Sequence, residues 1–355
     1  MCVRITSMNG VDLNRFEFDY DVTWNSFFLD EKLNVYSRYG GRDDGEPERR
    51  LSKDALLRTM RSVLAAHAER KARPSETADL LQPIPKAKST PEDIPLLKQN
   101  HQGCVHCHQV KEYQLLQWAH DGVFDRRKLF GWPVPENMGV ELDLNHGTKV
   151  LKVRPDSPAE KAGLKAGDVL ARWNDVPVRS EYDIRWVLHR ASDTEPMVLQ
   201  VRRGVDALKP ERTGTAEVDR RPTLRLELRP EGDWRPTEIG WRKSMRSVPL
   251  EFEFRGYALS KSQRAELKLA EDQMAIRVVS AKAAGLAGNL GLKKGDVITA
   301  AAGRSDNRTI EQLLSDLLRV YSPGDEVRMT VLRDGVEVPL KGKFPNWHTD
   351  ETTVP

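Results

Sequence analysis

The alternation of apolar and polar positions repeats once in the second half of the chain. The stretch GLKAGDVL at 163–170 returns as GLKKGDVI at 291–298, and a β-rich run precedes each copy. A polar turn and an amphipathic helical pattern follow each copy, at 180–191 and 308–321. This repeated order of elements predicts that both regions adopt the same small fold.

Strands are predicted to close each copy, at 197–204 and 326–340. In the second of these runs, Asp334-Gly335 lies between alternating residues and predicts a tight hairpin. We therefore expect two β-rich domains with two helices each, spanning 135–230 and 250–345.

The amino-terminal part has its own periodic pattern. Residues 15–21, RFEFDYD, alternate apolar and acidic side chains and predict a strand, and 25–41 read as strand, turn and strand before a glycine pair. A helix is predicted over 51–71 with Ser52 as its N-cap. Its apolar positions recur at helical spacing: Leu56, Leu57, Met60, Val63 and Leu64.

Stretches rich in proline and polar residues mark the predicted boundaries between parts. The fold class that follows is α+β with several domains, a partial α/β half-domain preceding two small β-sandwich or barrel domains. The predicted parts are a half-domain at 1–72, a linker at 73–100, a helical segment at 101–134 with its helix at 110–120, the first repeat at 135–230, a linker at 231–249, the second repeat at 250–345 and a tail at 346–355.

The composition excludes several classes of protein. The chain carries 56 basic and 53 acidic residues, a net charge of +3, and this balance gives no argument for nucleic-acid binding. It contains no apolar run of about 18 residues, so no transmembrane segment is predicted. The first residues, MCVRITSMNG, contain no apolar leader of the secretory kind.

The most specific chemical motif is Cys104-Val105-His106-Cys107-His108. The C-x-x-C-H spacing suits covalent haem, with thioether bonds at both cysteines and His108 as an axial iron ligand. His120 or Met138 would then supply the second axial ligand. The same residues also suit a redox dithiol or disulfide, a metal site completed by His101 or His120, or unreactive thiols. These alternatives stay open at this point.

The residues of the repeat carry a resemblance to a known family. Ser157-Pro158-Ala159, the stretch 162–170 and Asn174-Asp175 resemble bacterial PDZ domains of the kind attached to HtrA proteases and other exported proteins. The resemblance implies that an extended peptide or a carboxyl-terminal tail adds to a sheet edge while a glycine loop holds its carboxylate. That loop would contain Met138, Gly139 and Val140.

The resemblance also implies a second wall for the peptide groove. In the first repeat this wall is the helix at 180–191, where Ile184, Val187 and Leu188 either face the groove or belong to the core. In the second repeat Arg255 replaces the apolar residue of the loop, so we do not expect carboxylate capture there. Leu313, Leu314 and Leu317 are expected in its core.

Protease activity is not expected from this resemblance. The chain has no Gly-x-Ser-x-Gly setting for a nucleophile, and His67, His146 and His189 read as ordinary surface or helix residues. No other catalytic residue is predicted, except that Cys2 is a weak candidate for thiolate chemistry.

The order of all parts resembles a bacterial family that joins a thioredoxin-like domain to PDZ domains, some members of which use selenocysteine. This implies that 1–72 is the carboxy-terminal half of a thioredoxin-like domain whose redox half is encoded upstream of Met1. It also implies an exported, periplasmic setting.

Two functions remain open from the sequence. The first is an exported, non-enzymatic protein that binds peptides through PDZ domains and is associated with redox chemistry. The second is a haem-carrying redox or sensor protein that uses its PDZ domains for docking. Self-association through the PDZ domains is a third use of the same surfaces. The tryptophans at 118, 132, 234 and 241 are expected to pack between the parts.

Overall fold

The chain folds into two compact units, each assembled from segments that are distant in the sequence. The computed structural model describes residues 1–100, 103–204 and 222–347. The first-repeat unit consists of 8–93 and 130–237, and the second-repeat unit consists of 1–7, 94–129 and 238–355. Both are mixed α+β. The amino-terminal section therefore belongs to the same body as the first repeat.

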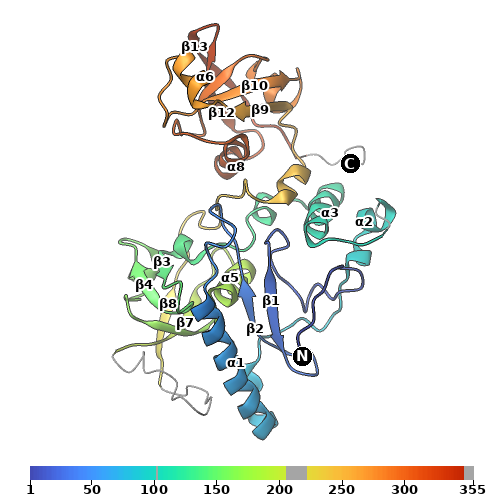
Figure 1. Ribbon diagram of the computed structural model, residues 1–355, viewed down its shortest axis with the longest axis vertical. Coiled ribbons are helices and arrows are strands. Elements are labelled where there is room, and N and C mark those ends of the chain that lie inside the picture. Colours follow the sequence, from blue (N-terminus) through green and yellow to red (C-terminus); the bar gives the residue numbers. More distant parts are fainter. Residues whose placement is uncertain (101–102, 205–221, 348–355) are drawn as a thin grey trace. The chain divides into compact units, whose positions relative to one another are not determined.

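Within the described residues, three antiparallel sheets build the first-repeat unit (Figure 1). They pair β1 with β2, β3 with β4, and the strands β6-β5-β7-β8 in that order. The elements are β1 (Asn25–Leu29), β2 (Val35–Gly40), α1 (Lys53–Ala72), η1 (Pro74–Glu76), η2 (Ala78–Leu80), η3 (Pro91–Asp93), η5 (Pro135–Met138), β3 (Val140–Leu142), β4 (Val150–Val153), α4 (Pro158–Lys161), β5 (Val169–Trp173), β6 (Val176–Pro177), α5 (Glu181–Arg190), β7 (Met197–Arg202) and β8 (Leu224–Leu228).

The predicted hairpin and helix of the amino-terminal section are confirmed. β1 and β2 pair across the predicted turn, and the Ser52 side chain accepts a hydrogen bond from the Ala55 N–H at the start of α1. The buried face of α1 differs from the predicted one, because small residues such as Ala55 and Ala66 face inward while Leu64 is exposed. A close approach of the helix to its neighbours favours these small side chains.

The predicted strand at 15–21 is wrong. This stretch forms turns and irregular backbone, because its polar groups bind side chains rather than a neighbouring strand. The Glu17 carbonyl accepts a hydrogen bond from Arg38 Nε at 3.0 Å, and the Asp19 N–H donates to the Tyr182 hydroxyl at 2.7 Å. Alternation alone did not distinguish these two uses of the backbone.

The stretch predicted as a linker, 73–100, divides between the two units. In the first-repeat unit Thr77, Leu80 and Gln82 are buried, and Leu80 packs with Tyr36. The Gln82 N–H also donates to the Val35 carbonyl at 2.8 Å. Residues 73–93 are therefore packed against the hairpin.

A five-stranded antiparallel sheet forms the centre of the second-repeat unit, in the order β13-β12-β11-β10-β9. The predicted hairpin is confirmed, since Asp334 and Gly335 adopt φ angles of 51° and 81° between its strands. The elements are α2 (Pro95–Asn100), α3 (Cys107–His120), η4 (Arg126–Lys128), η7 (Lys243–Ser247), β9 (Phe254–Ala258), α6 (Lys261–Glu266), β10 (Ile276–Ala281), α7 (Gly285–Leu290), β11 (Val297–Ala301), α8 (Ile310–Val320), β12 (Glu326–Arg333) and β13 (Val336–Lys343).

The repeated GLKxGD motif has the same structure in both copies. Asp168 is buried and receives two hydrogen bonds of 2.7 Å from Arg203, which also donates to the Gly163 carbonyl. Asp296 receives the same pair from Arg333, also at 2.7 Å. In each copy, two hydrogen bonds from one arginine join the aspartate of the motif to the end of the next long strand, β7 in the first copy and β12 in the second. This shared contact gives the aspartate the same structural role in both copies.

One buried carboxylate joins α5 of the first repeat to the amino-terminal section. Asp183 has no exposed surface. It accepts hydrogen bonds of 2.7 Å from Ser37 Oγ, the Arg38 N–H and Gln82 Nε2. Two further backbone N–H groups, of Arg179 and Ser180, complete its shell. The helix, strand β2 and the 73–93 stretch therefore converge on one side chain.

We predict that Asp183→Ala lowers the free energy of unfolding of the first-repeat unit by about 3 kcal/mol or more, because it leaves several buried donors unpaired. Urea unfolding followed by fluorescence of the buried Trp173 and Trp186 measures this loss. Gln312, at the same N3 position of α8, is the matched control. Gln312→Ala removes only a helix cap, and this cap lies in the second-repeat unit, so the unfolding transition reported by Trp173 and Trp186 should stay as in the wild type. Equal losses in both variants would contradict the role given to Asp183.

Candidate peptide-binding site

The loop that leads into β3 is built around a glycine that no other residue replaces without strain. Gly139 has φ +86°, and a Cβ placed there would lie 2.2 Å from Ser157 Cβ and Oγ. Ser157 is held there because it caps α4 and accepts a hydrogen bond from the Glu160 N–H. The predicted apolar-Gly-apolar loop therefore has a specific conformation, set by its contact with α4.

Strand β3 has an open edge. Among the described strands it pairs only with β4, in a two-stranded sheet. The Gly139 carbonyl accepts a hydrogen bond from the Arg154 N–H, and Val140 is the next residue, opposite Val153. Because hydrogen-bonded and non-hydrogen-bonded pairs alternate in an antiparallel ladder, the Val140 N–H and carbonyl point to the open edge. This edge is where an extended chain can add.

The residues predicted to line the groove are buried. Their exposed fractions are 0% for Met138, Val140, Ile184 and Leu188 and 4% for Val187. All five belong to one hydrophobic cluster around Trp173. In this structure they form the core of the domain, and the residues on the opposite face of α5 are buried as well, so the backbone edge of β3 is what remains for an added strand.

Trp132, a tryptophan expected to pack between parts, lies against the opposite face of α5. The Trp132 ring stacks on Tyr182 and His189, with centroids 5.0 and 4.9 Å apart. Its carbonyl accepts a hydrogen bond of 3.0 Å from Arg185. Tyr182, Arg185 and His189 recur at helical spacing on one side of α5, and the stretch that precedes η5 covers them. The expected packing of Trp132 between parts thus takes place within the first-repeat unit.

A cluster of charges lies where η5 and α5 approach each other. Arg50 donates to Glu136 Oε1 at 2.7 Å, to Glu181 Oε1 at 2.9 Å and to Asp43 Oδ2 at 2.6 Å. Burial alone would raise the pKa of Asp43, but hydrogen bonds from Arg49 and Arg50 lower it to about 2. Burial raises the pKa of Glu181, while Arg50 opposes that shift. Arg50 is therefore the main positive charge that holds these carboxylates together.

The comparisons with known proteins agree with this geometry. Residues 136–211 match the PDZ domain family. Over 62 residues the chain is 34% identical to a probable periplasmic serine endoprotease DegP-like of Marinomonas sp. (strain MWYL1), and over 65 residues 31% identical to the protein of that name from Rickettsia conorii (strain ATCC VR-613 / Malish 7). Each match covers 18% of this chain and 13% of the relative.

Two solved structures of HtrA-type proteases also match. A serine-to-alanine variant of the protease AlgW with a decapeptide is 20% identical, with 39% of this chain and 41% of that chain covered at a TM-score of 0.26. AlgW with a tripeptide is also 20% identical, with 35% and 41% covered at a TM-score of 0.23. The sequence matches define the class: the chain contains a PDZ domain related to those of HtrA-type proteases. Because it spans 13% of the curated relatives, their protease activity does not transfer with the domain.

The edge strand of the second repeat, β9, carries exposed side chains where the first repeat has buried ones. The loop expected at 255–260 begins inside β9, where Arg255 and Tyr257 are exposed. β9 is the last strand of its sheet. Leu313 and Leu317 of α8 are fully buried, which confirms their predicted place in the core, and Leu314 is partly buried.

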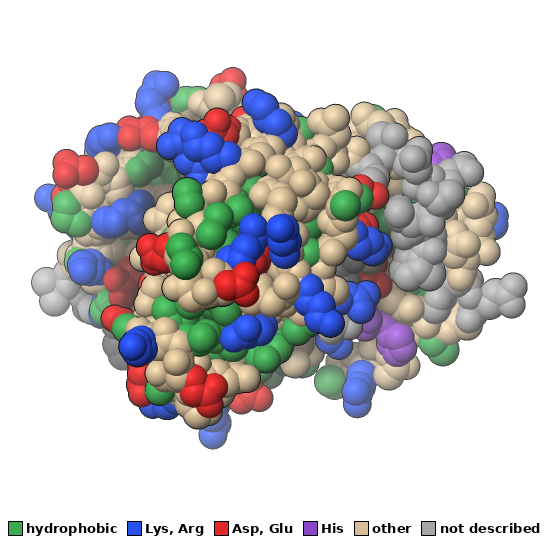
Figure 2. Space-filling view, turned by 90° about the horizontal axis from the view of Figure 1, so that it is seen from above, with side chains coloured by type: hydrophobic (Ala, Val, Ile, Leu, Met, Phe, Trp, Pro, Cys, Tyr) green, Lys and Arg blue, Asp and Glu red, His purple; other side chains and the backbone are tan. Residues whose placement is uncertain are grey.

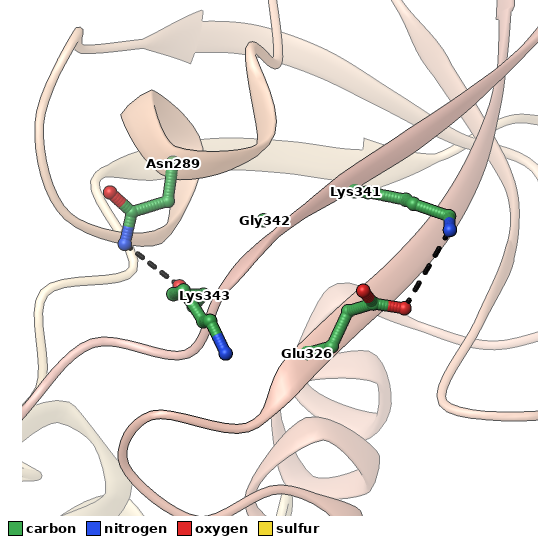
Figure 3. Close-up of a pocket in the computed structure, with 5 residues that line it drawn as sticks. All are labelled: Asn289, Glu326, Lys341, Gly342 and Lys343. Atoms are coloured by element: carbon green, nitrogen blue, oxygen red, sulfur yellow. Dashed lines mark hydrogen bonds and ion pairs between the residues drawn. The ribbon is translucent and has the colours of Figure 1, made fainter.

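A shallow hollow of about 390 Å³ lies at the other edge of that sheet (Figure 3). It is lined by α7, β12 and β13, with Glu326 3.8 Å from Lys341 and Asn289 Nδ2 donating to the Lys343 carbonyl at 2.8 Å. Figure 2 shows basic and acidic side chains interspersed over the face it draws. This mixture fits the balanced composition.

The C-x-x-C-H motif lies at the start of α3. Cys107 and His108 are the first two residues of this helix, which begins three residues earlier than predicted. Cys104 is exposed and Cys107 partly buried, and the structure holds both as thiols. The imidazoles of His106 and His108 lie parallel, with centroids 6.0 Å apart. Both cysteines therefore keep some exposed surface at the start of α3.

One of the two predicted second haem ligands, His120, lies too far from His108. His120 ends the same helix that His108 begins, so the two lie about 18 Å apart along the axis at 1.5 Å per residue. That distance is too long for one iron. Met138 is buried in the core of the first-repeat unit. The expectation that His120 shares an iron with His108 is therefore wrong.

The remaining candidate metal-ligating and thiolate residues do not form a site in the described part of the chain. Among the described residues no cluster of three or more His, Cys, Asp or Glu side chains is arranged to hold a metal ion. His101, considered for a zinc site, lies outside the described residues. Cys2 is exposed. Over the part of the chain that the structure describes, no helix is both long enough and apolar enough to span a bilayer.

We predict that Gly139→Ala lowers the free energy of unfolding by roughly 2–5 kcal/mol, because the left-handed backbone and the clash with Ser157 both oppose a side chain. Gly163 is the matched control, since its φ is +81° and an added Cβ meets nothing within 4 Å. Gly163→Ala should cost only the backbone part, roughly 1–2 kcal/mol. Thermal unfolding of the two variants compares them directly, and equal losses would contradict the packing described for Gly139.

Proposed function

We propose that the first PDZ domain binds an extended peptide or a protein carboxyl-terminal tail at the open edge of β3. The observation that carries this proposal is the juxtaposition of that edge with the Gly139 loop. The Val140 N–H and carbonyl pair with the added strand, and the loop receives its end. The chain thus acts as a binding protein, and catalysis by this domain forms no part of the proposal.

The setting belongs to the same proposal. The two curated relatives are described as periplasmic, and both match over a stretch of PDZ-domain size. We place this chain in the periplasm or another exported compartment, where its partners are exposed protein tails. Fractionation of cells that express the full gene tests this location.

We predict that an immobilised library of decapeptides with free carboxylates retains the protein, while the same peptides with carboxyl-terminal amides bind at least about tenfold more weakly, because a lost charge-assisted bond is worth about 1.5–3 kcal/mol. Fluorescence anisotropy of the best ligand measures the ratio. Amides at 139–142 should gain protection from hydrogen exchange on binding. A library with no ligand would refute the proposal, and equal binding of acid and amide would move the site away from the loop.

The C-x-x-C-H segment supports a second candidate function, tied to the accessibility of both thiols at the start of α3. We propose that Cys104 and Cys107 carry a reversible redox or covalent cofactor role. If haem is the group, it supplies electron transfer, Cys104 and Cys107 hold it by thioether bonds and His108 ligates the iron.

One spectrum discriminates these uses of the cysteines. Protein made in a strain competent for haem attachment should show a Soret band that survives acid-acetone extraction if haem is covalent. A colourless protein whose two thiols oxidise to an intramolecular disulfide supports the dithiol instead. Cys104→Ser should abolish either property, and Cys2→Ser is the control that should change neither. Colourless protein with unreactive thiols would end both proposals.

A further inference from the structure

The amino-terminal section holds both elements that border the open edge of β3. Arg50 donates to Glu136, in η5 just before β3, and to Glu181, the first residue of α5. Its side chain is 17% exposed, so most of the guanidinium is covered. A single side chain from outside the PDZ sequence thus ties together the loop and the helix that an incoming peptide would have to pass between.

The turn that follows β3 is held by the same section. The Ser52 hydroxyl donates to Asn145 Oδ1 at 2.7 Å. Gly147 lies against α1, where a Cβ added to this glycine would lie 3.7 Å from Ala55 Cβ. Thr59 Oγ1 donates to the Arg179 carbonyl at 3.0 Å, just before α5. Contacts from residues 43–59 therefore reach both ends of β3 and the start of α5.

These contacts differ in kind from the Asp183 centre. Asp183 is fully buried and saturated with donors, so that junction is permanent in the folded unit. Of the Arg50 ion pairs, the one with Glu136 is the most exposed: the Glu136 side chain is 36% exposed, whereas that of Glu181 is 13% exposed. An ion pair with an exposed carboxylate is weak and is screened by salt, whereas a buried pair is screened much less. The amino-terminal section is therefore held firmly at Asp183, and its contact through Arg50 and Glu136 is the one that can be released.

We propose that residues 43–59 form a clasp that closes the peptide groove of the first PDZ domain, with Arg50 as its latch. The inference rests on the proposed peptide binding, and it adds that binding requires release of Arg50 from Glu136, the more exposed of the two carboxylates that it joins. In the closed state the loop and helix cannot separate to admit a strand beside β3. The apparent affinity for a peptide is then reduced by the fraction of molecules that are open.

The chain provides a matched pair of variants. Arg50→Ala removes the latch, whereas Arg49→Ala removes a neighbouring arginine that pairs with Asp43 at 2.6 Å and with Asp44 at 3.3 Å. We expect Arg50→Ala to accelerate hydrogen exchange of the amides at 138–142 and to tighten binding of the free-carboxylate decapeptide about tenfold, if about one molecule in ten is open in the wild type. Arg49→Ala should change neither quantity.

A second measurement follows the salt dependence of hydrogen exchange in the wild-type protein, with Arg50→Ala as the comparison. Raising NaCl to about 1 M should accelerate exchange at 138–142 in the wild type, because salt screens the exposed ion pairs, and should have no such effect in Arg50→Ala. Unchanged exchange in both tests would overturn the clasp. Faster exchange without peptide binding would support the clasp and refute the proposed peptide function, so the two failures are distinguishable.

Discussion

The buried carboxylate of Asp183 is the constraint on which the first-repeat unit depends. A charge without exposed surface is stable only if donors surround it, and here these donors come from Ser37, Arg38, Gln82 and the backbone before α5. Loss of any of these segments would leave the carboxylate short of partners. The PDZ domain and the amino-terminal hairpin therefore form one body, although more than a hundred residues separate Ser37 from Asp183.

Neighbouring side chains reinforce this junction. Arg38 is fully buried, lies 4.0 Å from the Trp186 ring and donates to Gln82. Burial lowers its pKa to about 10, opposed by the charge of Asp183. Trp186 Nε1 donates to Glu17, which also pairs with Arg190. One side of α5 thus contacts the amino-terminal section and another belongs to the PDZ core.

Much of the local structure was predictable from the sequence. Ser52 caps its helix as predicted, the helix predicted at 180–191 forms α5, and Asp334-Gly335 turns a hairpin. The GLKxGD motif makes the same contact with an arginine in both copies, and its resemblance to PDZ domains is confirmed for the first copy by the family match over 136–211. The strand predicted at 15–21 does not form, because backbone groups of this stretch make hydrogen bonds with the side chains of Arg38 and Tyr182 instead of with a neighbouring strand. Both residues lie further along the chain, where the local alternation gives no sign of them. The redox assignments of Cys104 and Cys107 stay predictions.

The sequence by itself determined the long helices α1, α5 and α8 and the hairpin turn at Asp334-Gly335, because caps, turns and periodicity act over a few residues. It did not determine which face of α5 is core and which is groove. Ile184, Val187 and Leu188 suit either role by their chemistry, and only packing against Trp173 placed them inside. The tertiary structure alone brought Arg50 to Glu136 and Glu181. Ion pairs form between whichever charges the fold brings together, and the local sequence around Arg50 does not indicate which distant carboxylates will lie beside it.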